Sequence, residues 1–367
     1  MTFRKPNSCE TLSSFLTAWR VHQGVSRTAF DEAVCRRDPS VSVALSVDPD
    51  FPHHPSWQKV LSEATGIPLD DFVNFRDEYG AWPLFPAARH CACLACLRMA
   101  DTTNEQYGDV FWTRSTVTTC FCHGYPLVTV PAIGCGWADL PAKIRRERDT
   151  LMLQPELSQE LILLQWSQID KAIRDAIYFA EISLWTSGVD ERVFSAFLRH
   201  SDPSPDLEVR TFHARSVWQD LLTLLCCSWS EETSPAVAVE GLPVMIRLDQ
   251  KPLLRCSNRP TLLRPPTIEL FRSIGDPELR RACILVAMDA IHPNYLIERR
   301  KPDGLLEGWR YVIVRMPESA WQWLERQSKM WSTEWQESFT SWADFRETYF
   351  KRWPITRRRV LHGALYQ

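Results

Sequence analysis

Five of the twelve cysteines in this 367-residue chain lie between residues 91 and 122, and this clustering constrains the fold more than any other sequence feature. The first group reads C-A-C-L-A-C at residues 91–96, and the second reads C-F-C-H at residues 120–123. No secretory signal is recognisable near the start of the sequence, so the chain is expected to be cytoplasmic, where thiols stay reduced. Clustered cysteines in such a chain indicate a metal site rather than disulfides.

Two pairs within these groups have the spacing of zinc ligands. Cys93 and Cys96 form a C-x2-C pair, and Cys120 and His123 form a C-x2-H pair. A two-residue gap lets both side chains of a pair reach one ion, and four such ligands complete a tetrahedron around Zn²⁺. A site closed by four protein ligands has no position for water or substrate. The zinc is therefore predicted to be structural, not catalytic.

Spacing alone leaves the choice of ligands open. Cys91 is an alternative to Cys93. Cys122 is likewise an alternative to Cys120, and His90 lies next to the first group. Each alternative loses the two-residue gap. The cysteines could also be buried thiols without a metal, since free cysteine often packs as a small hydrophobe. A zinc-deaminase site is excluded, because its H-x-E and P-C-x-x-C motifs are absent.

Residues 1–80 are predicted to form a helical module. Apolar residues recur at helical spacing from Leu12 to Trp19, which places them on one face of a first helix. Ser8 is expected to cap this helix, and Gly24 to end it. A second helix is expected to start at Ser26.

The rest of this module is predicted to contain a helix-turn-helix. Residues 38–55 are rich in Pro and Asp and are expected to form a loop. A helix over about residues 55–65, a G-I-P turn at residues 66–68 and a helix from Leu69 then follow. This order is the outline of a helix-turn-helix, although many helical hairpins look the same.

Charge argues against this module as a reader of DNA. The whole chain has a net charge of −3, and residues 1–80 hold eight Lys and Arg against eleven Asp and Glu. Asp70 and Asp71 stand at the start of the would-be recognition helix, where carboxylates would repel phosphates. The module is therefore interpreted as a protein-docking surface. The two acids would also simply stabilise the helix N-terminus.

Residues 81–145 are predicted to form the zinc-binding domain and residues 146–367 a helical C-terminal region, so the fold class is mainly α. A long helical stretch is expected over residues 161–179. A further helix is expected to begin at D-P-E, residues 276–278, and to end before H-P at residues 292–293. The last stretch is rich in tryptophan, which would fill a helical core or anchor a partner. Its members include Trp321, Trp331 and Trp335.

The sequence carries no motif of an enzyme or of a membrane protein. A P-loop, H-E-x-x-H, G-x-S-x-G and G-x-G-x-x-G are all absent. The longest apolar run, residues 282–288, is too short to span a bilayer. A non-catalytic protein without a membrane partner is expected. The alternative, a metal-dependent nuclease with scattered carboxylates, has no spacing that singles out any of the 45 acids.

These residues together resemble the TniQ family of transposition proteins. The family begins with an E-S-L-x-S-[WF] helix, and this chain reads E-T-L-S-S-F at residues 10–15. An A-T-G-I run at residues 64–67 matches the next motif. The zinc motif reads C-L-A-C-L at residues 93–97, with Trp112 midway and C-F-C-H-G-Y-P-L at residues 120–127. Leu94 stands where the family usually has Pro. The family often has further zinc ligands downstream, and in this chain only Cys135 is conveniently placed for such a second site.

The resemblance implies a target-selection adaptor for DNA integration. Such proteins link target recognition to an AAA+ transposition ATPase of the TnsC or TniB kind. Some dock, often as homodimers, on the CRISPR Cascade ribonucleoprotein, close to the target DNA, and the acidic module favours this mode. Relatives such as TnsD bind target DNA directly. That alternative, a DNA-binding selector or regulator with a zinc ribbon, draws support from a basic tail: Lys351, Arg352, Arg357, Arg358 and Arg359.

Overall fold

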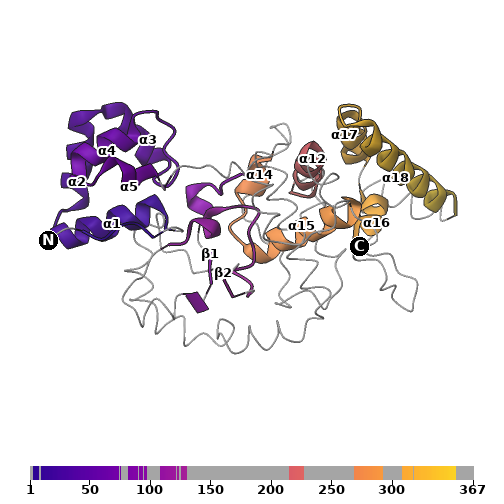
Figure 1. Cartoon of the computed structure of the whole chain (residues 1–367). Helices are drawn as coiled ribbons and strands as arrows, with labels where there is room; N and C mark the ends of the chain where they lie inside the picture. Colours follow the sequence, from indigo (N-terminus) through magenta and orange to yellow (C-terminus); the bar gives the residue numbers. More distant parts are fainter. Residues whose placement is uncertain are drawn as a thin grey trace, which may run out of the picture. The chain divides into compact units, whose positions relative to one another are not determined.

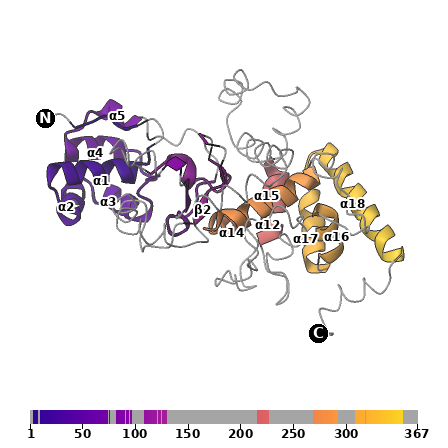
Figure 2. The same ribbon diagram turned by 90° about the horizontal axis from the view of Figure 1, so that it is seen from below.

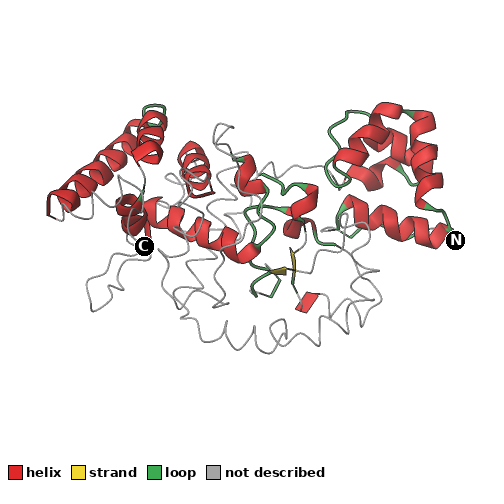
Figure 3. Cartoon of the chain, turned by 180° about the vertical axis from the view of Figure 1, so that it is seen from behind, coloured by secondary structure: helices red, strands yellow, loops and turns green. Residues whose placement is uncertain are grey.

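The computed structural model of the chain describes thirteen stretches of residues, and all structural statements below concern them. They are residues 3–7, 10–73, 75, 82–89, 91–93, 95–96, 108–120, 122–123, 125–129, 215–226, 268–291, 308–316 and 318–352. The chain divides into two compact units, residues 1–163 and residues 164–367. Each unit is described by itself. Helix predominates in the described part of both units (Figure 3), which confirms the mainly α prediction.

The first unit begins with a module of five helices (Figures 1 and 2). They are α1 (Leu12–Gln23), α2 (Arg27–Arg37), α3 (Pro39–Val47), α4 (Trp57–Thr65) and α5 (Leu69–Val73). Their apolar faces meet in one core, whose fully buried members include Phe15, Leu61 and Phe72. Phe72 meets Phe15 and Trp57 edge to face, with ring centroids 6.2 and 6.3 Å apart. Aromatic burial therefore holds the module together.

Helix α1 begins later than the sequence suggested. Thr11, not Ser8, is the N-cap, and its hydroxyl oxygen accepts a hydrogen bond from the Ser14 amide at 3.3 Å. The prediction of Ser8 was wrong because Thr11 stands directly before the apolar face and supplies the same oxygen. Gly24 ends the helix in the left-handed conformation, with φ of 65°, as predicted. Ser26 caps α2, also as predicted.

The expected loop at residues 38–55 was partly wrong, because it contains α3. Asp38 caps this helix, accepting hydrogen bonds from the amides of Ser40 at 2.8 Å and Val41 at 3.4 Å. Pro39 occupies its first turn. The Pro and Asp content of residues 38–55 indicated a loop, whereas a carboxylate cap followed by a fixed φ also starts a helix well. Only Val41 of α3 is fully buried, against the core of the module.

The predicted pair of helices around Gly66 is confirmed. Gly66 ends α4 with φ of 72°, and its amide donates to the Ser62 carbonyl at 2.8 Å. The Ser62 hydroxyl donates to the Ile67 carbonyl at 2.6 Å, which fixes the turn. Helix α5 then starts at Leu69, with Asp70 in its first turn. A helix, a glycine turn and a second helix therefore follow one another here.

The described residues between 82 and 129, which carry the Cys and His pairs, have little regular structure. They contain the short 3-10 helices η1 (Pro86–Ala88) and η2 (Val110–Thr113) and the strands β1 (Cys91–Ala92) and β2 (Val128–Thr129). The two strands pair antiparallel, with Cys91 opposite Thr129 and Ala92 opposite Val128. A small core of seven buried residues lies among them: Cys91, Ala92, Cys93, Trp112, Val117, Cys120 and Leu127. Burial alone gives this part of the chain little stability.

The described regular structure of the second unit is helical. It contains α12 (Arg215–Cys226), α14 (Glu269–Arg272), α15 (Pro277–Ile291), α16 (Gly308–Arg315), α17 (Glu318–Ser328) and α18 (Thr333–Arg352). Helix α15 begins and ends where the D-P-E and H-P motifs predicted. Trp331 and Trp335 are buried, and the Trp331 indole donates to Asp220 at 2.7 Å. These two tryptophans therefore fill a core. The helix predicted over residues 161–179 lies outside the described residues.

Within the described residues, no helix combines the length and the apolar character needed to cross a bilayer.

Candidate metal centre

The structure brings together the four side chains that the spacing singled out. They are Cys93, Cys96, Cys120 and His123, and one ligand atom of each lies within 4.8 Å of those of the other three. The Cys96 Sγ lies 3.3 Å from the His123 Nδ1 and 3.6 Å from the Cys120 Sγ. The Nδ1 also lies 3.7 Å from the Cys93 Sγ and 3.6 Å from the Cys120 Sγ. The quartet is close enough to bind one metal ion.

These separations match the edges of a tetrahedron. Metal–sulfur bonds of about 2.3 Å and metal–nitrogen bonds of about 2.0 Å at tetrahedral angles place neighbouring ligand atoms about 3.5–3.8 Å apart. The four distances from 3.3 to 3.7 Å lie close to this range. Three thiols and one imidazole at these separations surround a common centre that a metal ion can occupy. The donor set of three sulfurs and one nitrogen suits a borderline-soft cation.

A hairpin-like turn positions the second pair of side chains. Thr119 and Pro126 form an antiparallel bridge, and the Cys120 amide donates to the Tyr125 carbonyl at 2.8 Å. The chain therefore reverses between Cys120 and Tyr125, which places Cys120 and His123 at the tip. The Tyr125 ring stacks on the His123 imidazole at 6.0 Å. This contact supports the ring orientation that presents Nδ1 to the sulfurs.

The sulfurs influence one another's protonation. Hydrogen bonds from the Cys120 thiol, and then from Cys96, lower the pKa of Cys93 to about 3. Hydrogen bonds with Cys120 and Cys93 raise the pKa of Cys96 above its ordinary value. A bound cation would draw the remaining protons off, because a metal ligand must be a thiolate.

The alternative ligands occupy other positions. Cys91 lies in β1 with its thiol 3.4 Å from the Trp112 carbonyl oxygen, and it is outside the quartet. Cys122 is exposed at the tip of the turn. His90 and Cys135, and with Cys135 the question of a second site, lie outside the described residues. Among the described residues, the C-x2-C and C-x2-H pairs are the side chains that converge.

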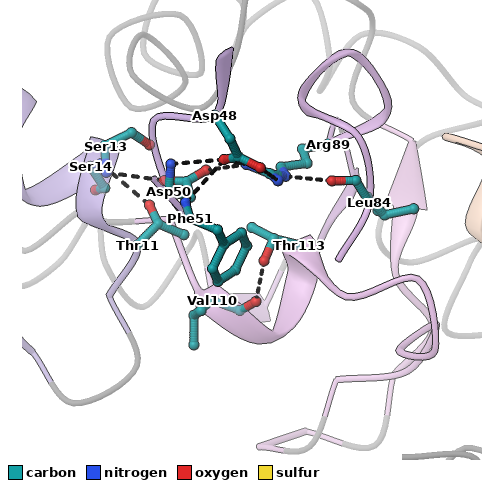
Figure 4. Close-up of polar contacts among 10 residues, drawn as sticks. All are labelled: Thr11, Ser13, Ser14, Asp48, Asp50, Phe51, Leu84, Arg89, Val110 and Thr113. Carbon is teal, nitrogen blue, oxygen red and sulfur yellow. Dashed lines mark hydrogen bonds and ion pairs between the residues drawn. The ribbon is translucent and has the colours of Figure 1, made fainter. Parts of the chain in front are cut away.

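A buried cluster of charged side chains joins the loop after α3 to Arg89, and sequence reasoning missed it (Figure 4). The Arg89 guanidinium donates to Asp48, through Nη1 at 2.7 Å and also through Nη2, and to Asp50 Oδ2 at 2.9 Å. Its Nε donates to the Leu84 carbonyl at 2.9 Å. Burial by itself would lower the pKa of Arg89, but its bonds and attraction to Asp48 and Asp50 outweigh burial and raise it. Arg89, Asp48 and Asp50 are called the Arg89 cluster below.

The Arg89 cluster also fixes backbone on the helical side. Asp50 Oδ1 accepts from the Ser13 amide in α1, and Asp48 Oδ1 accepts from the amides of Asp50 and Phe51, each at 3.0 Å. The Phe51 ring lies between two guanidinium groups, 5.0 Å from that of Arg89 and 4.9 Å from that of Arg114. Cation–π attraction thus adds to the charge pairing. No local motif could have revealed this cluster, because its partners are about forty residues apart in the sequence.

A second junction joins the start of α1 to the segment before η2. The Thr11 amide donates to the Gly108 carbonyl at 2.8 Å, and the Gly108 amide donates to the Ser14 hydroxyl at 3.0 Å. Glu10 and Asp109 form an antiparallel bridge at the same place. Thr11, Ser14 and Gly108 are called the α1 junction below. The buried Glu10 carboxylate is itself paired with Arg4 at 2.6 Å.

Asp109 connects this junction to the metal centre. Its carboxylate accepts from the Phe111 amide at 2.9 Å and so caps η2, the turn that supplies Trp112 to the small core. Burial raises the pKa of Asp109 to about 7, and the nearby Cys120 adds to the effect. The position of the carboxylate is thus set by its capping role.

Compared with protein-family models, curated proteins and solved structures, the chain has no match. The resemblance to the TniQ family accordingly stays a prediction that rests on the motifs described above.

Proposed function

We propose that this chain is a non-catalytic target-selection adaptor of a transposition system. It would link a target-recognition complex, the CRISPR Cascade ribonucleoprotein, to an AAA+ transposition ATPase of the TnsC or TniB kind. The observation that carries the proposal is the order of parts in one compact unit. A helical module with its glycine turn is followed by a Cys3His quartet with the spacing of the TniQ zinc motif.

Zinc is the metal that we assign to the quartet. Three thiolates and one imidazole in a tetrahedral arrangement are a common structural zinc set, and the four protein ligands close the coordination shell. The role of the ion would be to hold the segments between β1 and β2, whose own core is small. The function assigns no catalytic residue to this site. In an adaptor, zinc would stabilise a surface that partners bind.

The charge of the helical module favours a protein or ribonucleoprotein partner. Asp70 is exposed and Asp71 half-buried in the first turn of α5, the helix that would enter a DNA groove in a DNA-binding helix-turn-helix. Carboxylates there would face phosphates. Guide pairing within Cascade would read the target sequence instead, and this chain would stay near the DNA through the complex. A homodimer would present two such surfaces.

Affinity purification of the tagged chain from its native host tests the proposal. Mass spectrometry, RNA sequencing and metal analysis are run on the same eluate. We expect the AAA+ ATPase, Cascade subunits, a guide RNA and about one zinc per chain. Cys96→Ser should lose the zinc and the partners together. Cys122→Ser removes an exposed thiol of the same turn and should keep both. Zinc without any ATPase or ribonucleoprotein would refute the adaptor role.

Direct DNA binding is the second candidate, favoured by one observation. Lys351 and Arg352 are exposed at the end of α18, and the basic residues at 357–359 follow in the sequence. Lys351 is already paired with Glu347 at 2.8 Å, which reduces its share of a phosphate-binding surface. A gel shift with naked target DNA that weakens steeply with salt would favour this role over the adaptor.

A further inference from the structure

The helical module meets the described residues of 82–129, called the metal-binding segments below, at two places, the Arg89 cluster and the α1 junction. The Arg89 cluster holds the loop after α3 through a residue four positions before Cys93. The α1 junction holds the first turn of α1 through Gly108, two residues before η2. The order of the metal-binding segments and the order of these two parts of the module are therefore physically connected.

A bound ion would supply much of the order of the metal-binding segments. Between Cys91 and Thr129, the described regular structure consists of two two-residue strands and one four-residue 3-10 helix. Seven buried residues form their core, and two of these are cysteines of the quartet. Small domains with so little buried area commonly fold only when the metal is bound. Removal of the ion would release the chain on both sides of Ala92, toward Arg89 and toward Gly108.

Release of Arg89 would leave two carboxylates buried without a cation. The Asp50 side chain is 1% exposed, and that of Asp48 is 12% exposed. An unpaired buried charge is strongly unfavourable, so both carboxylates would move into water. The amides of Ser13, Asp50 and Phe51 would then lose their acceptors. The core residues of α2 and α4, among them Val34 and Leu61, make none of these bonds.

We propose that metal occupancy of the quartet acts as a latch on the helical module. With the ion bound, the Arg89 cluster and the α1 junction hold the start of α1 and the loop at residues 48–51. Without the ion, these two parts open while α2 and α4 stay folded. This inference rests on the proposed metal centre.

Amide hydrogen exchange of the full chain, with and without a zinc chelator, tests the latch. Peptides covering residues 11–16 and 48–54 report on the latch, and peptides covering α2 and α4 serve as internal controls. We expect chelation to speed exchange of the Ser13, Asp50 and Phe51 amides about tenfold or more, and added Zn²⁺ to restore it. Faster exchange across residues 91–129 with unchanged exchange at 11–16 and 48–54 would overturn the proposal.

Two variants separate the latch from the metal centre. Arg89→Met in the zinc-loaded protein should speed exchange of the same peptides while the zinc content stays unchanged, because Arg89 is not a ligand. Ser14→Ala should affect mainly residues 11–16, through Gly108. If Arg89→Met is insoluble, chelation of the unaltered chain decides alone. A chain that binds no metal overturns the centre and the latch together. A coupled chain that recruits no ATPase refutes only the adaptor role.

Discussion

Replacing Arg89 by Met should destabilise the first unit more than any surface substitution. Methionine keeps much of the side-chain length but removes the charge and three donors that face Asp48, Asp50 and the Leu84 carbonyl. Removing one partner of a buried ion pair costs about 3–5 kcal/mol, because the other charge stays buried without compensation. The Arg89 side chain is 1% exposed, so solvent screening does not reduce this figure.

The expected change in melting temperature follows from the size of the unit. For 150–250 residues, 1 kcal/mol shifts the midpoint by about 2–4 °C. The first unit spans residues 1–163, so Arg89→Met should lower its midpoint by about 6–20 °C. Differential scanning calorimetry of the zinc-loaded full chain measures the shift.

Arg37→Met is the matched control. Arg37 is exposed on α2 and donates only to the Ala33 carbonyl in its own helix, at 2.8 Å. Its loss should change stability by less than about 0.5 kcal/mol. Equal midpoints for Arg89→Met and Arg37→Met would refute the reasoning, since they would mean that the two carboxylates do not need the guanidinium.

Three further predictions concern other parts of the chain. Cys96→Ser should reduce the zinc content from about one ion per chain to near zero and destabilise the first unit by roughly several kcal/mol. Cys122→Ser should keep the zinc. Metal analysis and calorimetry check both variants. Gly66→Ala and Gly24→Ala should each lower the free energy of unfolding in urea by about 1–2 kcal/mol, because both glycines have positive φ, which strains a residue with a Cβ. The added methyl group would enter open space at both positions, so a much larger loss would contradict strain as the cause. Burial raises the pKa of Asp289 to about 6, above the unfolded value near 3.8, so ionisation of Asp289 opposes folding. As the pH rises from 4 to 7, the free energy of unfolding of the unaltered chain should fall by up to about 3 kcal/mol relative to that of Asp289→Asn. Parallel curves for the two proteins would contradict this.

Local signals predicted the helices and the convergence of the quartet. Gly24, Ser26 and Gly66 act through their own backbone or the next turn, so the sequence around them is sufficient. The C-x2-C and C-x2-H gaps are equally local. Helix α3 was missed because Asp38 and Pro39 suit both a turn and a helix start, and the choice depends on Val41 reaching the core of the module.

The Arg89 cluster lies beyond such reasoning for a different reason. Its members are ordinary charged residues in segments with no periodic pattern, and tertiary folding alone brings them together. Unlike the Cys and His pairs, an Arg that is buried beside two Asp has no recognisable pattern in a single sequence. The assignment of zinc rests on the ligand spacing and on the donor set of three sulfurs and one imidazole, and the assignment to transposition rests on the motif resemblance.

The Arg89 cluster also restricts how this protein can change during evolution. Loss of Arg89 leaves two buried carboxylates without their cation. Loss of Asp48 or Asp50 removes a charge and also the acceptors of backbone amides. Single steps away from this arrangement are therefore costly, while joint replacement by apolar residues of similar volume can be neutral. In related sequences, positions 48, 50 and 89 should accordingly vary together or not at all, although about forty residues separate the acids from the arginine.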